Sequence, residues 1–152
     1  MAGDDETVVR VHAASVHMDV WHVVTGRPYV LRLAGNGVSK PKRPVPGTDL
    51  AGRVESIGRN VTRFTPGDEV FGEIPAISWW NGGAFAECAA VPEAGLALRP
   101  DNFTFEQAAA VPTSGSIALR NLRGAGRLEA GQSVPINGAG GCVGRLRGRS
   151  WG

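Results

Sequence analysis

The sequence predicts a mainly β protein with some α: a bent antiparallel barrel, then short helices, then one short strand with a glycine-rich loop. Three observations predict this fold class. Apolar and polar residues alternate over Thr7–Ala14 and Leu50–Glu55, which is the pattern of half-buried strands. Two tight-turn triplets, Gly58-Arg59-Asn60 and Pro66-Gly67-Asp68, punctuate the central region. The 22 glycines and 10 prolines among 152 residues suit a turn-rich β fold.

The first hundred residues supply the barrel. Residues 1–6 are a polar tail, and the polar and aromatic segment HMDVWH after Ser15 suits a loop or a single helical turn. Strands that meet at glycine-rich corners favour a small, strongly bent barrel over a flat sheet. The expected strands are, in order, Thr7–Ala14, Leu50–Glu55, Glu69–Phe71 and Gly83–Val91.

The character of the chain changes after Pro100. Asp101 or Asn102 is expected to cap a short helix over Phe103–Ala110. Small and apolar residues that recur every four positions predict a second helix over Thr113–Arg123. Glycines then mark turns before a short apolar strand at Ser133–Asn137.

Composition limits the classes of function. The net charge is only +2, so the sequence gives no general case for nucleic-acid binding, and the basic run Lys40–Arg43 reads as a solvated loop. Two cysteines make no disulfide framework, and no apolar run reaches the length of a membrane helix. The first residues are acidic and lack the pattern of a signal peptide. We therefore expect a soluble cytoplasmic protein without a membrane partner.

A glycine triplet near the end of the chain is the strongest chemical motif. Gly138, Gly141 and Gly144 follow the expected short strand. Glycines at such positions permit a tight turn and let backbone N–H groups approach a pyrophosphate. By itself the triplet is a weak signal for cofactor binding.

Longer phrases carry a family resemblance. PGTDLAGRVESIG followed by VTRFTPGDEVFG resembles the alcohol dehydrogenase-like N-terminal domain of medium-chain dehydrogenase/reductases, and within them the zinc-independent, quinone-oxidoreductase-like branch. LEAGQSVPINGAGGCVG resembles the nucleotide loop of the same family. The resemblance implies a GroES-like barrel with connecting helices over residues 7–127. It also implies the first strand and glycine loop of an incomplete NAD(P)-binding Rossmann domain over 128–144, with an atypical tail at 145–152.

The resemblance implies an activity as well. Family members transfer a hydride from NADPH, or NADH, to a quinone, an enone or an aldehyde, and they tend to form homodimers. RLRGRSWG after the glycine loop leaves no room for the rest of a Rossmann domain. We therefore expect a truncated, poorly active form whose dimer-forming part is largely missing. The alternatives are a catalytically inactive binding or interaction module and a zinc-type alcohol dehydrogenase.

The resemblance also points to cleft residues. Zinc-independent relatives carry an N-P-x-D-like phrase after the first strand, where polar side chains lie near the nicotinamide and the substrate. Here His17 replaces the asparagine and Asp19 stands one residue early, while Tyr29 takes the place of a family tyrosine. Structural roles are equally open: a turn cap for Asp19 and a half-buried ring for Tyr29. Ile117 replaces a threonine that bonds the cofactor in similar proteins.

Metal and thiol chemistry have little support in the sequence. Gly47-Thr48-Asp49 stands where zinc-dependent relatives carry G-H-E, and their cluster of four cysteines is absent, so we expect no zinc. Three histidines recur every five residues, a spacing that fits neither a helix face nor a strand face. Cys88 is expected to be a buried, inert thiol, and Cys142 a packing residue inside the glycine loop.

Overall fold

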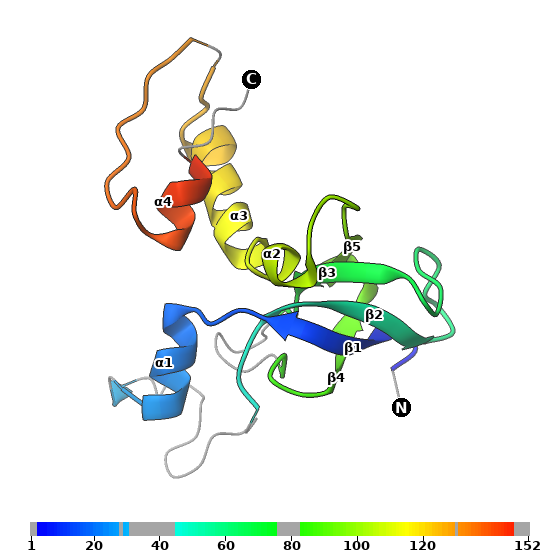
Figure 1. The fold of residues 1–152 in the computed structure, drawn as a ribbon. Coiled ribbons are helices and arrows are strands. Elements are labelled where there is room, and N and C mark those ends of the chain that lie inside the picture. Colours follow the sequence, from blue (N-terminus) through cyan, green and yellow to red (C-terminus); the bar gives the residue numbers. More distant parts are fainter. Residues whose placement is uncertain (1–2, 28, 31–44, 76–82, 130, 148–152) are drawn as a thin grey trace. The chain divides into compact units, whose positions relative to one another are not determined.

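A computed structural model describes residues 3–27, 29–30, 45–75, 83–129 and 131–147. The chain divides into two compact units, Met1–Ala110 and Val111–Gly152. The first unit holds the β-structure and the second holds helices (Figure 1). Each unit is described by itself.

The described part of the first unit contains one five-stranded antiparallel sheet with the order β4-β1-β2-β3-β5. A single 3-10 turn, η2 (Glu93–Gly95), joins β4 to β5, although these strands lie at opposite edges of the sheet. The sheet must therefore curve until its edges approach, which confirms the predicted bent barrel (Figure 1). The strands are β1 (Glu6–Ala14), β2 (Asp49–Ile57), β3 (Glu69–Glu73), β4 (Cys88–Pro92) and β5 (Leu96–Leu98).

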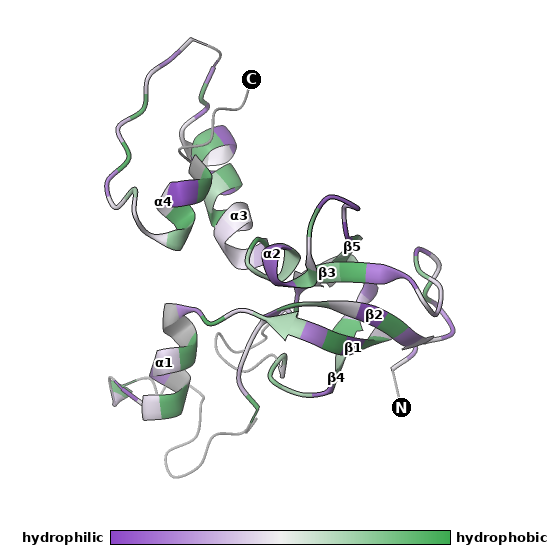
Figure 2. Cartoon of the chain, viewed as in Figure 1, coloured by the Kyte–Doolittle hydropathy of each residue, from purple (hydrophilic) through white to green (hydrophobic). Residues whose placement is uncertain are grey.

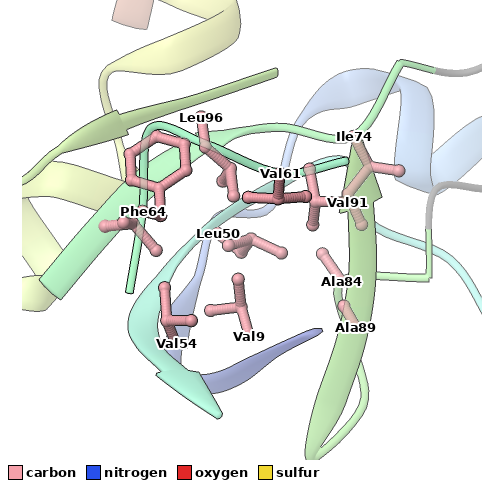
Figure 3. Close-up of a cluster of buried hydrophobic side chains, with 11 residues drawn as sticks. Val9, Leu50, Val54, Val61, Phe64, Ile74, Ala84, Ala89, Val91 and Leu96 are labelled. Carbon is pink, nitrogen blue, oxygen red and sulfur yellow. The ribbon is translucent and has the colours of Figure 1, made fainter. Parts of the chain in front are cut away.

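Alternation along the strands builds the core. In β1, Val9 is fully buried while Arg10 and His12 are exposed, as a half-buried strand requires. Figure 2 shows this alternation as bands of opposite hydropathy along β1 and β2. Figure 3 shows the resulting cluster, which consists of Val9, Leu50, Val54, Val61, Phe64, Val70, Ile74, Ala84, Ala89, Val91 and Leu96.

A short helix covers the other face of β2. Ala108 and Ala109 of α2 (Phe105–Ala109) pack with Ala51 in a second buried cluster. The first residues of β2 are therefore buried on both faces of the sheet. Thr104 caps α2 in a reciprocal capping box with Gln107, so the expected cap at Asp101 or Asn102 is wrong. A Thr and a Gln three residues apart satisfy two backbone N–H groups at once, and this spacing fixes the start of the helix.

An ion-pair cluster holds the chain that enters α2. Glu69 of β3 accepts hydrogen bonds from Arg53, at 2.7 Å, and from Arg99, whose Nε lies 2.9 Å from Oε2. The Arg99 guanidinium lies 5.1 Å from the ring centroid of Phe105, and His12 stacks on the same ring at 4.5 Å. Glu69 therefore links two strands to the start of α2.

Acid is expected to weaken this cluster. The guanidinium of Arg99, and after it that of Arg53, lowers the pKa of Glu69. A carboxyl whose pKa is lowered on folding contributes stability above its unfolded pKa, about 4.3, and loses that contribution as the pH falls through the folded pKa. Glu69→Gln should therefore flatten the fall in melting temperature below pH ~4.3. Glu87→Gln, which removes an exposed carboxylate elsewhere, serves as the control. If the melting temperature fell equally steeply with pH in both variants, the proposed role of Glu69 would be contradicted.

Several boundaries differ from the sequence prediction. Helix α1 (Met18–Thr25) runs for 8 residues, not for a single turn. It ends at Gly26, whose N–H donates to the His22 carbonyl. Strand β4 begins only at Cys88, where pairing with Arg10 of β1 starts. Strand β5 and the 3-10 turn were missed because three-residue elements carry no detectable period. Trp79, Trp80 and Asn81, expected in a turn, lie outside the described residues.

The second unit begins with α3 (Pro112–Leu119), which continues as the π-helix η3 (Arg120–Ala125). The predicted helix over Thr113–Arg123 is confirmed, and it begins at Pro112. A proline at the first helical position loses no hydrogen bond because its N–H would have no partner there.

The end of the second unit departs from expectation. Ser133–Asn137 forms no strand, and α4 (Cys142–Arg147) follows the glycine loop directly. A strand needs a hydrogen-bonded neighbour, and Pro135 lacks the backbone donor; the described residues of this unit offer no neighbouring strand. Helix α4 starts within the sequence of the glycine loop, at Cys142. No helix in the described part of the chain is long and apolar enough to cross a membrane.

Candidate functional site

A cluster of polar side chains lies where β1 ends and β2 begins. Nε2 of His17 is 2.9 Å from Oδ2 of Asp49 and 2.7 Å from the Ser15 hydroxyl oxygen. Thr48 donates its hydroxyl to the other Asp49 oxygen, Oδ1, at 3.1 Å. The antiparallel pairing of Ala14 with Leu50 places these strand ends together. The pairing continues one step further, since the Ser15 N–H donates to the Asp49 carbonyl at 3.2 Å.

Burial makes the pairing of His17 with Asp49 important. The Asp49 side chain is fully buried, and 10% of the His17 side chain is exposed. A carboxylate removed from water is costly unless hydrogen bonds and an opposite charge compensate it. Here an imidazole and a hydroxyl supply that compensation. The arrangement ties the loop after β1 to the first residue of β2.

The cluster contains a serine, a histidine and an aspartate, yet it is not a nucleophilic triad. In a triad the histidine uses one ring nitrogen toward the serine and the other toward the carboxylate. Here both oxygens contact the same nitrogen, Nε2. His17 therefore cannot take the serine proton while it also donates to Asp49. The arrangement is suited to orienting a hydroxyl and an imidazole, and it does not activate an alkoxide.

The three predicted cleft residues have different settings. His17 lies in the polar cluster. Asp19 belongs to α1, and its side chain lies outside the described residues. Tyr29 is 64% exposed, so the alternative of a half-buried ring is wrong. The prediction missed Ser15 and Asp49. An acidic residue at the head of a buried strand was the available signal.

The glycine loop is tightly folded. Gly138 has φ of 75°, and the Gly141 N–H donates to the Gly138 carbonyl at 3.0 Å. A Cβ on Gly144 would lie 2.2 Å from that same carbonyl oxygen, so a side chain there would break the contact between α4 and the turn. A Cβ on Gly140 would meet no atom within 4 Å. The loop thus combines a tight turn at Gly138 with open space beside the backbone of Gly140.

Both cysteines are exposed, which corrects the expectations of a buried Cys88 and a packed Cys142. Along β4 the side chains of Ala89 and Val91 face the core, so Cys88 faces out. Its Sγ donates to a Glu55 carboxylate oxygen at 3.2 Å. That hydrogen bond is the main reason why the pKa of the thiol is raised. Cys88 is therefore a weak nucleophile for a reason that the sequence did not reveal.

The histidines serve separate local contacts. His12 stacks on Phe105, and Nδ1 of His22 lies 2.7 Å from the carbonyl oxygen of Arg27. Within the described residues, no group of three or more His, Cys, Asp or Glu side chains is placed to hold a metal ion. Ile117, which replaces the cofactor-bonding threonine, is 43% exposed on α3.

Sequence relatives of known name align with most of the length of this chain. A quinone oxidoreductase-like protein 2 homolog from Nematostella vectensis is 34% identical over 116 residues, which is 76% of this chain and 30% of that protein. The quinone oxidoreductase of Homo sapiens is 31% identical over 142 residues, which is 93% of this chain and 39% of that protein. The chain thus spans roughly a third of the length of these relatives.

Structural and family comparisons agree with these relatives. The quinone oxidoreductase from Coxiella burnetii superposes with a TM-score of 0.83 at 25% identity, over 97% of this chain and 44% of that one. The profile of the family "Alcohol dehydrogenase GroES-like domain" matches residues 3–101, the region that forms the barrel. The chain therefore belongs to the alcohol dehydrogenase GroES-like domain family, in the quinone-oxidoreductase-like branch of the medium-chain dehydrogenase/reductase superfamily.

Proposed function

We propose that this chain forms the substrate side of an NAD(P)H-dependent oxidoreductase that reduces a quinone, an enone or an aldehyde. The observation that carries the proposal is the match of the barrel to its family over residues 3–101. The polar cluster around His17 and Asp49 supports it, because these hydrogen-bonding groups adjoin Val16 in the sequence, and Val16 and the nearby Trp21 of α1 expose apolar side chains. An apolar ring with a carbonyl oxygen matches that combination.

The glycine loop fits the phosphates of a nicotinamide cofactor in part. Gly138 supplies the tight turn, Gly144 the close contact with α4, and the open backbone at Gly140 leaves room for an approaching group. Gly138, Gly141 and Gly144 would hold the pyrophosphate. When bound, the cofactor supplies the hydride. We propose NADPH, with NADH as the alternative, and a reducing cytoplasmic setting in which Cys88 and Cys142 form no disulfide.

The barrel residues have two tasks in this reaction. The exposed apolar side chains bind the carbon skeleton of the substrate and keep water from the reacting carbon. The cluster at Ser15, His17 and Asp49 directs a polar group toward the substrate oxygen. Geometry of this kind raises the rate by holding reactants in alignment. Tyr29 and Asp19 remain proposed cleft residues.

The reaction is proposed to proceed without zinc. Thr48 is a poor zinc ligand, and Nε2 of His17 is engaged by Asp49 and Ser15. Purified protein, dialysed against a weak chelator, is expected to contain far less than one zinc per chain by elemental analysis. A stoichiometric zinc content in the parent chain that falls in the His17→Ala variant would overturn this part of the proposal and favour the zinc-type alcohol dehydrogenase.

A chimera tests the function. Residues 1–144 of this chain, joined to the part of the human quinone oxidoreductase that the chain does not cover, are expected to oxidise NADPH in the presence of a quinone. The 152-residue chain alone is expected to show no turnover above background, because its described residues contain no parallel sheet to hold the whole cofactor. A folded chimera that binds NADPH but reduces no quinone, enone or aldehyde would favour the alternative of an inactive binding module.

A further inference from the structure

Two oxygens lie within hydrogen-bond distance of the same ring nitrogen at the centre of the polar cluster. Nε2 of His17 lies 2.9 Å from the Asp49 carboxylate and 2.7 Å from the Ser15 hydroxyl oxygen. A ring nitrogen has one position in the ring plane, which holds either a proton or a lone pair. With a proton on Nε2, both oxygens accept from it, and both short contacts are favourable.

The opposite assignment is unfavourable. A lone pair on Nε2 would face an ionised carboxylate that can only accept hydrogen bonds. Thr48 already donates to Oδ1 of Asp49, as expected for a carboxylate that acts as an acceptor. The Ser15 hydroxyl therefore accepts from His17, and its own proton must be directed to a third group.

The described residues do not supply that third group. Among the described residues, the Ser15 hydroxyl has no hydrogen-bond contact other than that with His17. Ser15 is half-buried, and the next residue, Val16, is 78% exposed. A hydroxyl whose proton points away from His17 thus adjoins an exposed apolar residue in the sequence.

We propose that Ser15 donates this hydrogen bond to the carbonyl oxygen of the substrate. The substrate class rests on the proposed function. Hydride addition to the substrate carbon, which a bound nicotinamide would supply, would move the electrons of the carbonyl π bond to oxygen. The Ser15 hydroxyl stabilises the negative charge that develops there. His17 is a positioning residue, since its shared proton fixes the direction of the Ser15 O–H bond, and Asp49 holds His17.

Two matched probes test this without a cofactor. Acetophenone carries an apolar ring and a carbonyl oxygen, and ethylbenzene has nearly the same shape without the oxygen. Their affinities for the full 152-residue chain are measured by following backbone amide resonances near Val16 in NMR titrations. We expect Ser15→Ala to weaken acetophenone binding about two- to tenfold, the worth of one neutral hydrogen bond. Ethylbenzene binding should not change.

Further variants keep the test decisive. Ser15→Thr retains the hydroxyl and should restore acetophenone binding. Asp49→Asn removes the carboxylate beside His17. This variant should weaken acetophenone binding and shift the side-chain nitrogen resonances of His17. The proposal is overturned if Ser15→Ala weakens the binding of both probes equally, or if acetophenone does not bind to the parent chain. These outcomes are independent of turnover by the chimera, so failure here is distinguishable from failure of the proposed function.

Discussion

Gly52→Ala is expected to destabilise the barrel strongly. A Cβ at this position would lie 2.1 Å from the carbonyl oxygen of Arg10 and 2.9 Å from its carbon. Both atoms belong to the backbone of β1, which is held in register by pairing with β2 and β4. No rotamer change relieves such a clash, so the strands must separate. We expect a loss of at least about 3 kcal/mol in the free energy of unfolding.

A loss of this size is a large share of the 5–15 kcal/mol that stabilises an ordinary domain. Urea unfolding followed by far-ultraviolet circular dichroism measures it. Gly67→Ala is the matched control, because Gly67 has φ of 101° and a Cβ there would meet no atom within 4 Å. That variant should lose only about 1–2 kcal/mol, from backbone strain. Equal losses at both positions would show that the close approach of β1 to Gly52 does not limit stability.

The barrel was predictable because its signals are local. Alternation predicts which side chains of β1 face the core, and Val9 is fully buried as expected. The turn at Pro66-Gly67-Asp68 forms where its residue types predict, with Gly67 at positive φ. Each of these features depends on a few neighbouring residues, and the sequence displays those residues together.

The polar cluster depends on residues far apart in the chain. His17 and Asp49 are 32 positions apart, and only the register of β1 against β2 brings them together. The sequence indicated His17 through the family phrase but gave no distance to Asp49. The outward orientation of Cys88 was missed for the same reason, since it depends on where β4 begins its pairing with β1.

The glycine loop shows a different limit. Its residue types predict the turn at Gly138, which has positive φ as expected. The strand expected at Ser133–Asn137 needs a partner strand, and the described residues of the second unit provide none. A short apolar run before a glycine turn therefore predicts a strand only where the rest of a parallel sheet is present to pair with it.

Asp49→Ala is expected to be the most damaging change in the polar cluster. The substitution removes a fully buried carboxylate and leaves His17, which is 10% exposed in its side chain, without its charged partner. Removal of one member of a buried hydrogen-bonded pair typically costs about 1–3 kcal/mol, because the other member loses that hydrogen bond while it stays out of water. The free energy of unfolding in urea should fall by that amount.

A double-mutant cycle separates the pair from general loss of packing. His17→Ala, Asp49→Ala and the double variant are compared, and the two changes should be non-additive by about 0.5–3 kcal/mol because each removes the same contact. Thr48→Val removes the hydroxyl that donates to the other Asp49 oxygen and should lose only about 1 kcal/mol. Strict additivity of His17→Ala and Asp49→Ala would mean that the 2.9 Å contact between Nε2 and Oδ2 carries no coupling energy. The orientation of Ser15 by His17 would then lose its physical basis.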